Sequence, residues 1–580
     1  MTIMERIEAG IKKDHKPGEL DTSFVDAVYD LFYEFRDLYQ HEEWPRIKDN
    51  ELIYRGDHWH DVPMTDPNEP RPTTPVIQST VENIRADLMD EMPEAVIKPE
   101  DIGDEATAKI MTEIIAQNLE AIDYEAEYDL CTHDLLVDGW CVQESGWDST
   151  LHNGIGGAFI RHVSNMNFMT DPYCADIQKG RAVFKFDRLP KDYFRQHYKK
   201  QYAFMQGDLE TVNDDHFKFS NPVEPRETDY YILLEAWFRF FENGRYRVHM
   251  VKLAGRQVLE NSYLTKPDGY FAHGMYPFAV TPLFAQKGTP FGVGIVDMFK
   301  NAQKYSDKLD QILLVNSLIA SKPKLLVQKG LCDVDDLRDY AKSVHEVEGA
   351  PQAVAMWHDP PHLPSHVMAH AQTIRQSIKD ESGSNDFSRG NVSSGVTAAS
   401  AITALQEMSS KRSRTEAKRL QLGFKQCVRM MLEVEREFDR FPRMVTITNG
   451  GEPVRVTVTE RFYRENTFGK SVPIEFNISI KTMRETRFTK LANNELMLQA
   501  VNIFGQSADP VVIFEGMEFE GKEVLLEKLR AAQGRGMLAL QQQLAQAQAS
   551  IEQLSGENQK YAELVANMGE PQIPETLPQV

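Results

Sequence analysis

The chain has 580 residues, more than a single hydrophobic core usually serves, so about three or four domains are expected. Its 41% hydrophobic and 26% charged residues are typical of a folded protein in water, and it has no run of about 18 or more apolar residues that could cross a membrane. A formal net charge of −23 argues against a protein that wraps DNA by neutralising its phosphates, because that mode needs clustered lysine and arginine. Acidity of this kind can serve solubility alone.

The N-terminus and the cysteines indicate the compartment. The opening MTIMERIEAGIKKDHK lacks the apolar core of a signal peptide, so we expect a protein made in the cytoplasm. The cysteines are odd in number, widely spaced and without a CxxC pair, which predicts buried free thiols and no zinc site: Cys131, Cys141, Cys174, Cys332 and Cys427.

Amphipathic helices are predicted at the start of the chain. Residues 21–60 begin with one whose buried stripe is Val25, Val28, Phe32, Phe35 and Leu38. A second covers residues 74–92, and a third begins at Asp104 and turns Ile110, Ile114 and Ile122 toward a core.

The third helix lies in an acidic region. Between Glu91 and Leu130 there are twelve Asp and Glu residues and two Lys residues. A solvated helix face is the simpler interpretation. The alternative is a contact between subunits, made to a basic helix later in the chain.

Strands dominate from Trp140 to Pro290. The segments GAFIRHV, RAVFKFD, YYILLEAWFRF and YRVHMVKL are β-branched and aromatic and are separated by turn residues, with one short helix near Lys191–His197. This pattern predicts a mixed α+β region, which could equally be another β-rich binding module.

The stretch from Phe291 to Phe438 is the most distinctive. Apolar or small residues three and four apart predict a helix of roughly 25 residues from Ile295 onward: Ile295, Met298, Ala302, Tyr305, Leu309, Ile312, Asn316 and Ile319. After Pro323 come two predicted strands, Leu325–Gly330 and Ala353–Trp357. A second helix follows, with Val367, Ala371, Ile374 and Ile378 on its face. The segment from Ser382 to Gly395 is rich in Gly, Ser and Asn and predicts a solvated loop.

A very long helix is expected from Val396 to about Phe438. Its second half carries an apolar stripe of Leu420, Phe424, Cys427, Met431, Val434 and Phe438. From Lys411 to Arg429 there are seven Lys and Arg residues and one acidic residue, so this helix is basic within an acidic chain. A helix of this length is far above the globular mean and predicts a large assembly or a rod.

The remainder returns to strands and then to helix. MVTITNGGEPVRVTV predicts a hairpin, and Ile474, Phe476, Ile478 and Ile480 alternate as in a half-buried strand. We expect these strands to complete the sheets formed by residues 140–290. From Glu523 the chain should be helical, with a coiled-coil seam: Met537, Leu540, Leu544, Ala547, Ile551, Leu554, Asn558, Tyr561 and Val565. The tail EPQIPETLPQV is predicted to be disordered.

The sequence contains no convincing enzymatic motif. GKS at Gly469–Ser471 lacks the upstream glycine of a phosphate loop, because Arg464 occupies that place. His358, His362, His366 and His370 are spaced by four, but intervening prolines prevent one continuous helix. Two histidines on one face fall short of a metal site within one chain, so a solvated or pore-facing surface is favoured over metal binding. We therefore expect neither an enzyme nor a bound cofactor.

The order of helix, small α/β insertion, helix, flexible loop and long helix, with GNVSSGVTAASAITALQE at the loop exit, resembles the portal proteins of tailed bacteriophages. Earlier segments agree with the long-chain branch of that family: YRGDHW (Tyr54–Trp59), Arg71-Pro72, VIQSTVENIRADLMDEMPEAVIKPED, DGW (Asp138–Trp140), SNMNFMTDP (Ser164–Pro172) and MYPF (Met275–Phe278).

The resemblance implies an α+β, portal-type fold. Its expected domains are an N-terminal wing (1–290), a stem helix (291–321), a clip (322–363), a second stem helix (364–381), a tunnel loop (382–395), a long wing helix with wing strands (396–485), a crown with a coiled-coil helix (486–567) and a disordered tail (568–580). It also implies a dodecameric ring at one capsid vertex of the virion, with no membrane. The implied partners are double-stranded DNA that passes non-specifically, the terminase large subunit, a head-tail adaptor, and the major capsid and scaffolding proteins.

Site residues follow from the same resemblance. The DNA-channel loop would comprise Ser384, Asn385, Asp386, Ser388, Arg389, Gly390, Asn391, Ser393 and Ser394, with Arg389 as the phosphate contact. Partner docking at the clip would use Lys324, Lys329 and Trp357. Contacts between subunits would use Arg412, Arg414, Lys418, Arg419, Leu544, Ile551 and Leu554. Two other classes remain open: a coiled-coil scaffold or other virion structural protein, and a DNA-packaging enzyme.

Overall fold

The structure is a computed structural model. It describes residues 2–18, 22–205 except 65, 68, 91 and 101–103, 230–321, 324–331, 333, 335, 343–344, 346–350, 354–358, 366–383, 411–440, 442–445, 454–457, 463–465, 471–482, 556 and 560. The chain divides into two units, Met1–Met483 and Arg484–Val580. The elements below all belong to the first unit, and the predicted coiled-coil seam lies almost wholly outside the described residues.

Helices make up most of the first 140 residues. They are α1 (Ile3–Ile11), α2 (Thr22–Leu38), the π-helical turn η1 (Tyr39–Glu43), α3 (Trp44–Tyr54), α4 (Val76–Met89), α5 (Glu105–Ala121) and α6 (Tyr124–Val137). The predicted stripe of α2 is confirmed at Val25, Val28, Phe32 and Phe35, which are all at most 3% exposed. The helix also continues through η1 into α3, although Pro45 near the start of α3 cannot donate a backbone hydrogen bond to the preceding turn; the π-helical turn η1 lies directly before it.

Residues 140–293 form antiparallel sheets, as the alternating pattern predicts. One has the order β4-β5-β6-β7-β8 and the other the order β3-β2-β9. The strands are β2 (Trp140–Asp148), β3 (Gly157–Val163), β4 (Phe168–Thr170), β5 (Ala182–Pro190), β6 (Tyr230–Glu242), β7 (Arg245–Ala254), β8 (Gln257–Asn261) and β9 (Phe278–Pro282), followed by the short pair β10 (Phe284–Ala285) and β11 (Gly292–Val293). Short helices connect them: α7 (Leu151–Gly154), η2 (Asn165–Asn167), η3 (Ile177–Lys179), α8 (Lys191–His197), α9 (Lys199–Tyr202) and α10 (Ser262–Thr265).

The later strands correct one prediction. The hairpin is confirmed as β14 (Pro442–Val445) paired with β15 (Val454–Thr457), and β16 (Tyr463–Glu465) pairs with β17 (Ser471–Pro473). However, β18 (Phe476–Thr482) pairs with β1 (Pro93–Pro99) in a separate two-stranded ribbon. The expectation that these strands complete the sheets of residues 140–290 is therefore wrong for the described residues. An alternating pattern fixes which face of a strand is buried, but it does not fix which strand it pairs with.

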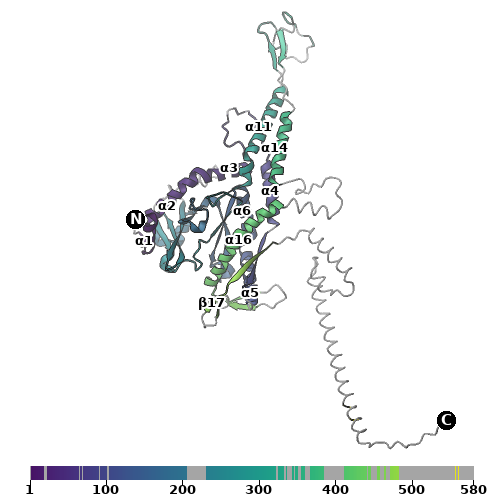
Figure 1. The fold of residues 1–580 in the computed structure, drawn as a ribbon. Helices are drawn as coiled ribbons and strands as arrows, with labels where there is room; N and C mark the ends of the chain where they lie inside the picture. The colour runs from purple at the N-terminus through teal and green to yellow at the C-terminus, as the bar shows by residue number, and fades with distance from the viewer. Residues whose placement is uncertain are drawn as a thin grey trace, which may run out of the picture. The chain divides into compact units, whose positions relative to one another are not determined.

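Two helices cover the sheets. Phe32 of α2 stacks edge-on against Phe184 and Phe186 of β5, with ring centroids 5.5 and 5.8 Å apart. The helix α16 (Lys411–Phe438) packs on β2 and β9, and the carboxylate of its buried Glu435 accepts a 2.8 Å hydrogen bond from the backbone N–H of Ala158 in β3. Figure 1 shows α16 lying across these strands.

Two of the helices predicted after Phe291 are confirmed as α11 (Ile295–Ser321) and α14 (His366–Ser382). They lie side by side, and β12 (Lys324–Val327) and β13 (Ala355–His358) form the hairpin between them in sequence (Figure 1). Among the described cysteines all are free thiols, as predicted: Cys131, Cys141 and Cys427 are buried and Cys174 is partly exposed.

Candidate assembly and channel surfaces

The base of α11 is fixed to the body by a buried polar cluster, which we call the clasp and define as His58, Thr74, Gln303 and Asp307. His58 Nδ1 lies 2.5 Å from Asp307 Oδ2, and both side chains are 1% exposed. The backbone N–H of Thr74 donates to the same carboxylate at 3.2 Å, and Gln303 Nε2 donates to it at 3.1 Å. The clasp thus joins the YRGDHW segment and the segment after Arg71-Pro72 to one turn of α11.

Charged pairs surround the clasp. Asp49 lies 2.8 Å from Lys300 Nζ and 3.3 Å from Lys304 Nζ. Burial alone would raise the pKa of Asp49, but hydrogen bonding and attraction to the two ammonium groups outweigh burial and hold that pKa below its usual value. The first three turns of α11 are therefore locked by opposite charges as well as by packing.

The two long helices are also joined directly. The Arg375 guanidinium of α14 forms an ion pair with Asp310 and donates a 3.1 Å hydrogen bond to Ser306 Oγ, both on α11. Ala371 and Ile378, two members of the predicted stripe of α14, are buried. These contacts hold α11 and α14 together within one chain.

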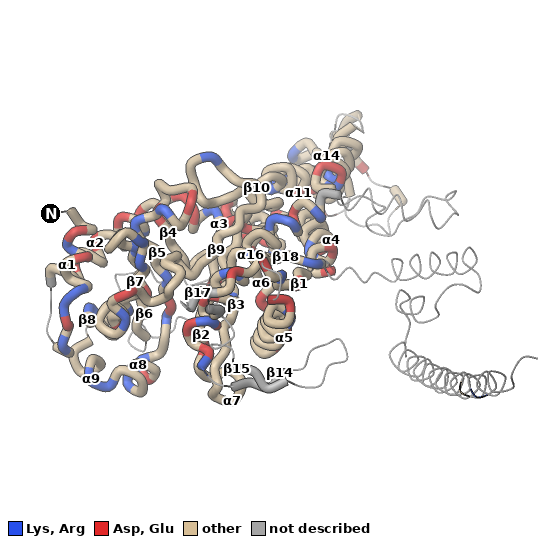
Figure 2. The backbone as a smooth tube through the Cα atoms, turned by 60° about the horizontal axis from the view of Figure 1, so that its bottom comes forward, with Lys and Arg blue, Asp and Glu red and all other residues tan. Residues whose placement is uncertain are grey.

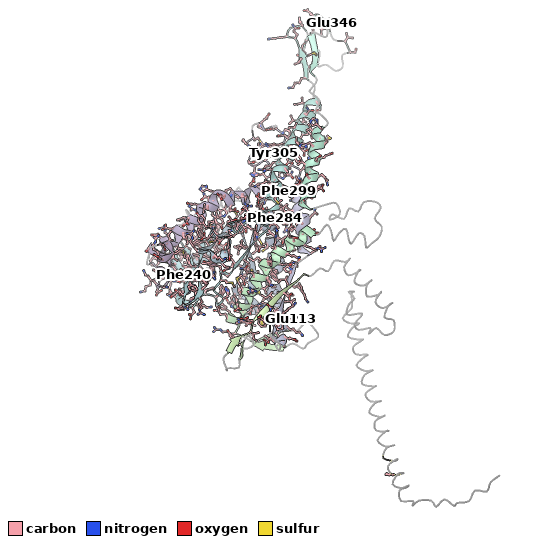
Figure 3. All side chains as sticks on the ribbon, viewed as in Figure 1. Glu113, Phe240, Phe284, Phe299, Tyr305 and Glu346 are labelled. Carbon is pink, nitrogen blue, oxygen red and sulfur yellow. The ribbon has the colours of Figure 1, made fainter. Side chains whose placement is uncertain are left out.

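On the face turned away from the body, α11 exposes an apolar stripe, which we call the stem stripe and define as Met298, Tyr305, Ile312 and Ile319. Their exposed fractions are 49%, 65%, 49% and 47%. The helical periodicity predicted from the sequence is confirmed. The members of the predicted stripe differ in exposure, however: Ile295 is buried in the body, as is the neighbouring Phe299, whereas the stem stripe faces outward. Figure 3 marks Phe299 and Tyr305 on this helix.

The hairpin β12–β13 carries the predicted docking residues. Lys324 is exposed and pairs in register with His358, and Leu325 pairs with Trp357. Lys329 is exposed in the turn that follows β12. A feature that the sequence prediction missed is the pair Leu326 and Met356, which lie opposite each other in the ladder and are 51% and 59% exposed. Leu326 alternates with the half-buried Leu325 and Val327, and this alternation is the sequence signal that could have identified the exposed face of the hairpin.

The four basic residues of α16 that were predicted to contact a neighbouring subunit lie in different environments. Lys418 is exposed, whereas Arg414 is half-buried, and the guanidinium of the half-buried Arg419 lies 5.2 Å from the centre of the Phe284 ring. Figure 3 marks Phe284 at this position. Arg412 is the second residue of α16, and its side chain lies outside the described residues. Lys418 is therefore the best placed of the four for an external contact.

The other predicted site residues lie outside the described residues, so the structure does not test them. They are Ser384, Asn385, Asp386, Ser388, Arg389, Gly390, Asn391, Ser393 and Ser394 of the loop, and Leu544, Ile551 and Leu554 of the coiled coil. The loop follows Gly383, which has φ +86°, a left-handed conformation that ends α14 as glycine commonly does. The chain therefore leaves the axis of α14 directly before Ser384.

The described part of the chain has neither a metal-binding cluster nor a membrane-spanning helix. In that part of the chain no group of three or more His, Cys, Asp or Glu side chains is placed to hold a metal ion. His366 and His370 lie exposed on α14, and His358 lies in β13. None of the described helices is long and apolar enough to span a membrane.

Comparison with known families gives a match over most of the chain. The family described as "Phage P22-like portal protein" matches residues 32–571, which include the clasp, both long helices and α16. No curated protein matches the chain.

Proposed function

The chain belongs to the phage P22-like portal protein family, and we propose that it forms a dodecameric ring at one capsid vertex, through whose channel the genome is packaged and later ejected. Portal proteins are structural components of the virion and not enzymes, so this chain acts by assembly and not by catalysis. The roles of the individual surfaces of this chain are proposals that rest on its membership of the family.

The stem stripe is the observation that best supports ring formation. Its four residues repeat every seven positions, which places them on one line of about 30 Å along α11. Heptad spacing is the pattern by which one helix packs against another at a shallow angle. A single chain leaves these side chains 47–65% exposed, at a cost in free energy that burial against a neighbour removes. We assign that neighbour as the stem of the adjacent copy.

Ring formation can be tested on the purified protein by negative-stain electron microscopy. We expect particles with a central hole. Replacing Tyr305→Glu together with Ile312→Glu places charge on the stem stripe and should leave folded monomers. Ser317→Glu is the matched control, because Ser317 is an exposed residue of the same helix, two positions from Ile319 and five from Ile312, and so lies roughly 150° around the helix from the stripe. Monomers or open fibres from the unmodified protein at every concentration would contradict the proposal.

We propose that the segment Ser384–Ser394 projects from the end of α14 into the channel and touches DNA non-specifically. Arg389 would contact phosphate, since a guanidinium binds phosphate regardless of base sequence. The glycines would let the loop follow a moving duplex. Deleting Ser384–Ser394 should abolish packaging or DNA retention and leave ring assembly intact. Normal genome retention by the deletion variant would remove the loop from the mechanism.

We propose that the β12–β13 hairpin is the clip, which binds the terminase large subunit during packaging and a head-tail adaptor afterwards. The exposed Leu326–Met356 pair supplies an apolar centre, Lys324 and Lys329 supply charge beside it, and Trp357 lies next to Met356 in β13. Met356→Asp should weaken binding of both partners to preformed rings. A variant that binds both at unmodified affinity would exclude this surface.

The coiled-coil seam that contains Leu544, Ile551 and Leu554 would add contacts among copies in the crown. A chain that ends at Gly521 distinguishes the portal from a scaffold held only by that seam. Rings should survive the truncation, because the stem stripe remains. Complete loss of assembly would favour the scaffold.

A further inference from the structure

The outer face of α16 carries a basic stripe with an apolar centre. We call it the wing stripe and define it as Lys418, Leu422, Lys425 and Arg429, which follow one another at steps of four, three and four and therefore share one face of the helix. Leu422 is 67% exposed, whereas the opposite face of α16, including Leu420 and Phe424, is at most 1% exposed. A single exposed leucine is common on protein surfaces, but Leu422 lines the same hollow as Ile478 and Ile480 of β18, and together they make an apolar centre among cations.

The surface next to the wing stripe is basic as well. A shallow hollow of about 540 Å³ lies between α16 and the β1–β18 ribbon, and Lys98, Lys418, Lys425 and Leu422 all line it. Asn477, Ile478, Ser479 and Ile480 of β18 form its other wall. A partner for this face must therefore be acidic at its rim and apolar at its centre.

The same chain has such a surface on the other part of the β1–β18 ribbon. We call it the acidic hollow; it has a volume of about 610 Å³ and lies between β1, α5 and the start of α6. Met92, Val96, Ile115 and Leu119 supply its apolar lining, and five carboxylates surround it: Glu94, Glu113, Glu120, Asp123 and Glu125. Lys481 is the one basic residue that lines it. Figure 2 colours the acidic residues of α5 red and the basic residues of α16 blue, and Figure 3 marks Glu113.

The two hollows are lined by different parts of the ribbon that meet at its middle. Glu94 pairs with Lys481 at the end that borders the acidic hollow, and Lys98 pairs with Asn477 at the end that borders the basic one. Between these ends, Ala95 and Val96 of the acidic hollow pair with Ile480 and Ser479 of the basic one. One chain thus presents two different, complementary patches. Contacts between unlike patches are heterologous, and a ring is the closed form of such contacts.

We propose that the wing stripe of one copy enters the acidic hollow of the next copy in the ring, with Leu422 on the apolar lining and Lys418 and Lys425 against its carboxylates. This inference rests on the proposed function and identifies a second contact between subunits, separate from the stem stripe. Helix-in-groove binding of this kind is a common mode of recognition. Complementary charge at its rim fixes which surfaces meet.

Charge reversal tests the pairing. Lys418→Glu with Lys425→Glu, or Glu113→Lys with Glu120→Lys, should each raise the protein concentration needed for rings by more than about tenfold, measured by mass photometry, because like charges then face each other. All four changes in one chain should restore assembly to within about threefold. Glu105→Lys is the matched control, an exposed residue of α5 that does not line the hollow. Failure of the combined chain to recover would overturn the pairing.

Cross-linking tests whether the contact is between copies. Leu422→Cys and Leu119→Cys are made in separate chains and mixed before assembly; oxidation should give covalent dimers only in the mixture. Intact rings without such dimers would overturn this inference and leave the proposed function standing. Absence of rings from the unmodified protein would instead overturn the proposed function. If a single chain carrying both cysteines forms only an internal disulfide, the hollow is filled by its own chain and the inference is wrong.

Discussion

Replacing His58 by alanine should loosen the base of α11. His58 Nε2 donates a 3.1 Å hydrogen bond to the carbonyl oxygen of Ile53, and its Nδ1 faces Asp307 at 2.5 Å. His58→Ala leaves the Asp307 carboxylate buried with only the donors of Thr74 and Gln303. Removing one hydrogen-bond partner of a buried carboxylate typically costs about 1.5–3 kcal/mol. At about 1.4 kcal/mol per factor of ten, opening of this region should become about 10- to 100-fold more frequent.

Amide hydrogen exchange read by mass spectrometry measures this opening locally. Peptides that cover residues 53–59, 72–77 and the first half of α11 should lose protection together, since the clasp joins all three. His60→Ala is the control: it removes a histidine two positions away, whose Nε2 lies 2.9 Å from Asp49 but whose side chain is 18% exposed. An exposed pair is worth at most about 1 kcal/mol. If both variants exchange alike, the clasp does not hold α11.

Three further outcomes follow from the packing and the titration of the core. In urea titrations of the monomer, Phe424→Ala should lower the free energy of unfolding by about 3–5 kcal/mol, because the Phe424 side chain is buried. Leu422→Ala should change that free energy by less than about 0.5 kcal/mol, because the Leu422 side chain is exposed. Gly423→Ala should destabilise although alanine favours helix, because a Cβ would collide with Thr281 Oγ1; adding Thr281→Ala should recover most of the loss. Burial lowers the pKa values of His249 and His273 to about 4, so the folded protein binds fewer protons than the unfolded chain, and stability should fall between pH 7 and pH 5. His249→Phe should reduce that fall by about 2 kcal/mol in pH-dependent melting and leave the contribution of His273.

Local patterns predicted local structure well. The helix Lys191–His197 and the strand Gly157–Val163 lie where the sequence places them, because side-chain period and turn residues are encoded within a few positions. The pairing of β1 with β18 was not predictable in this way, since the two strands are about 380 residues apart and each offers only an alternating pattern. The spacing of apolar residues within a segment therefore predicts whether it is a helix or a strand, but it does not predict which other strand it pairs with.

The candidate surfaces show the same limit. YRGDHW is visible as a motif, yet its role depends on Asp307, which is 249 residues from His58 in the sequence. The apolar period of α11 is equally visible, but the sequence does not tell which members the body buries. Ile295 and Tyr305 belong to one predicted stripe and have opposite exposure, because Tyr305 faces away from the body while Gln303, Ser306 and Asp307 next to it are buried against the body. Exposure depends on which face of a helix its neighbours cover, and that information is not local.

The rotation of α16 explains why Leu422 is exposed at all. Gly423 lies so close to Thr281 of β9 that no side chain fits between them, which fixes that face of the helix against the sheet. Successive helical residues point about 100° apart, so the residue before Gly423 must turn away from the sheet. Leu422 therefore cannot be buried by a small rotation of α16 without separating Gly423 from Thr281. A contact with a neighbouring copy buries Leu422 without disturbing that packing.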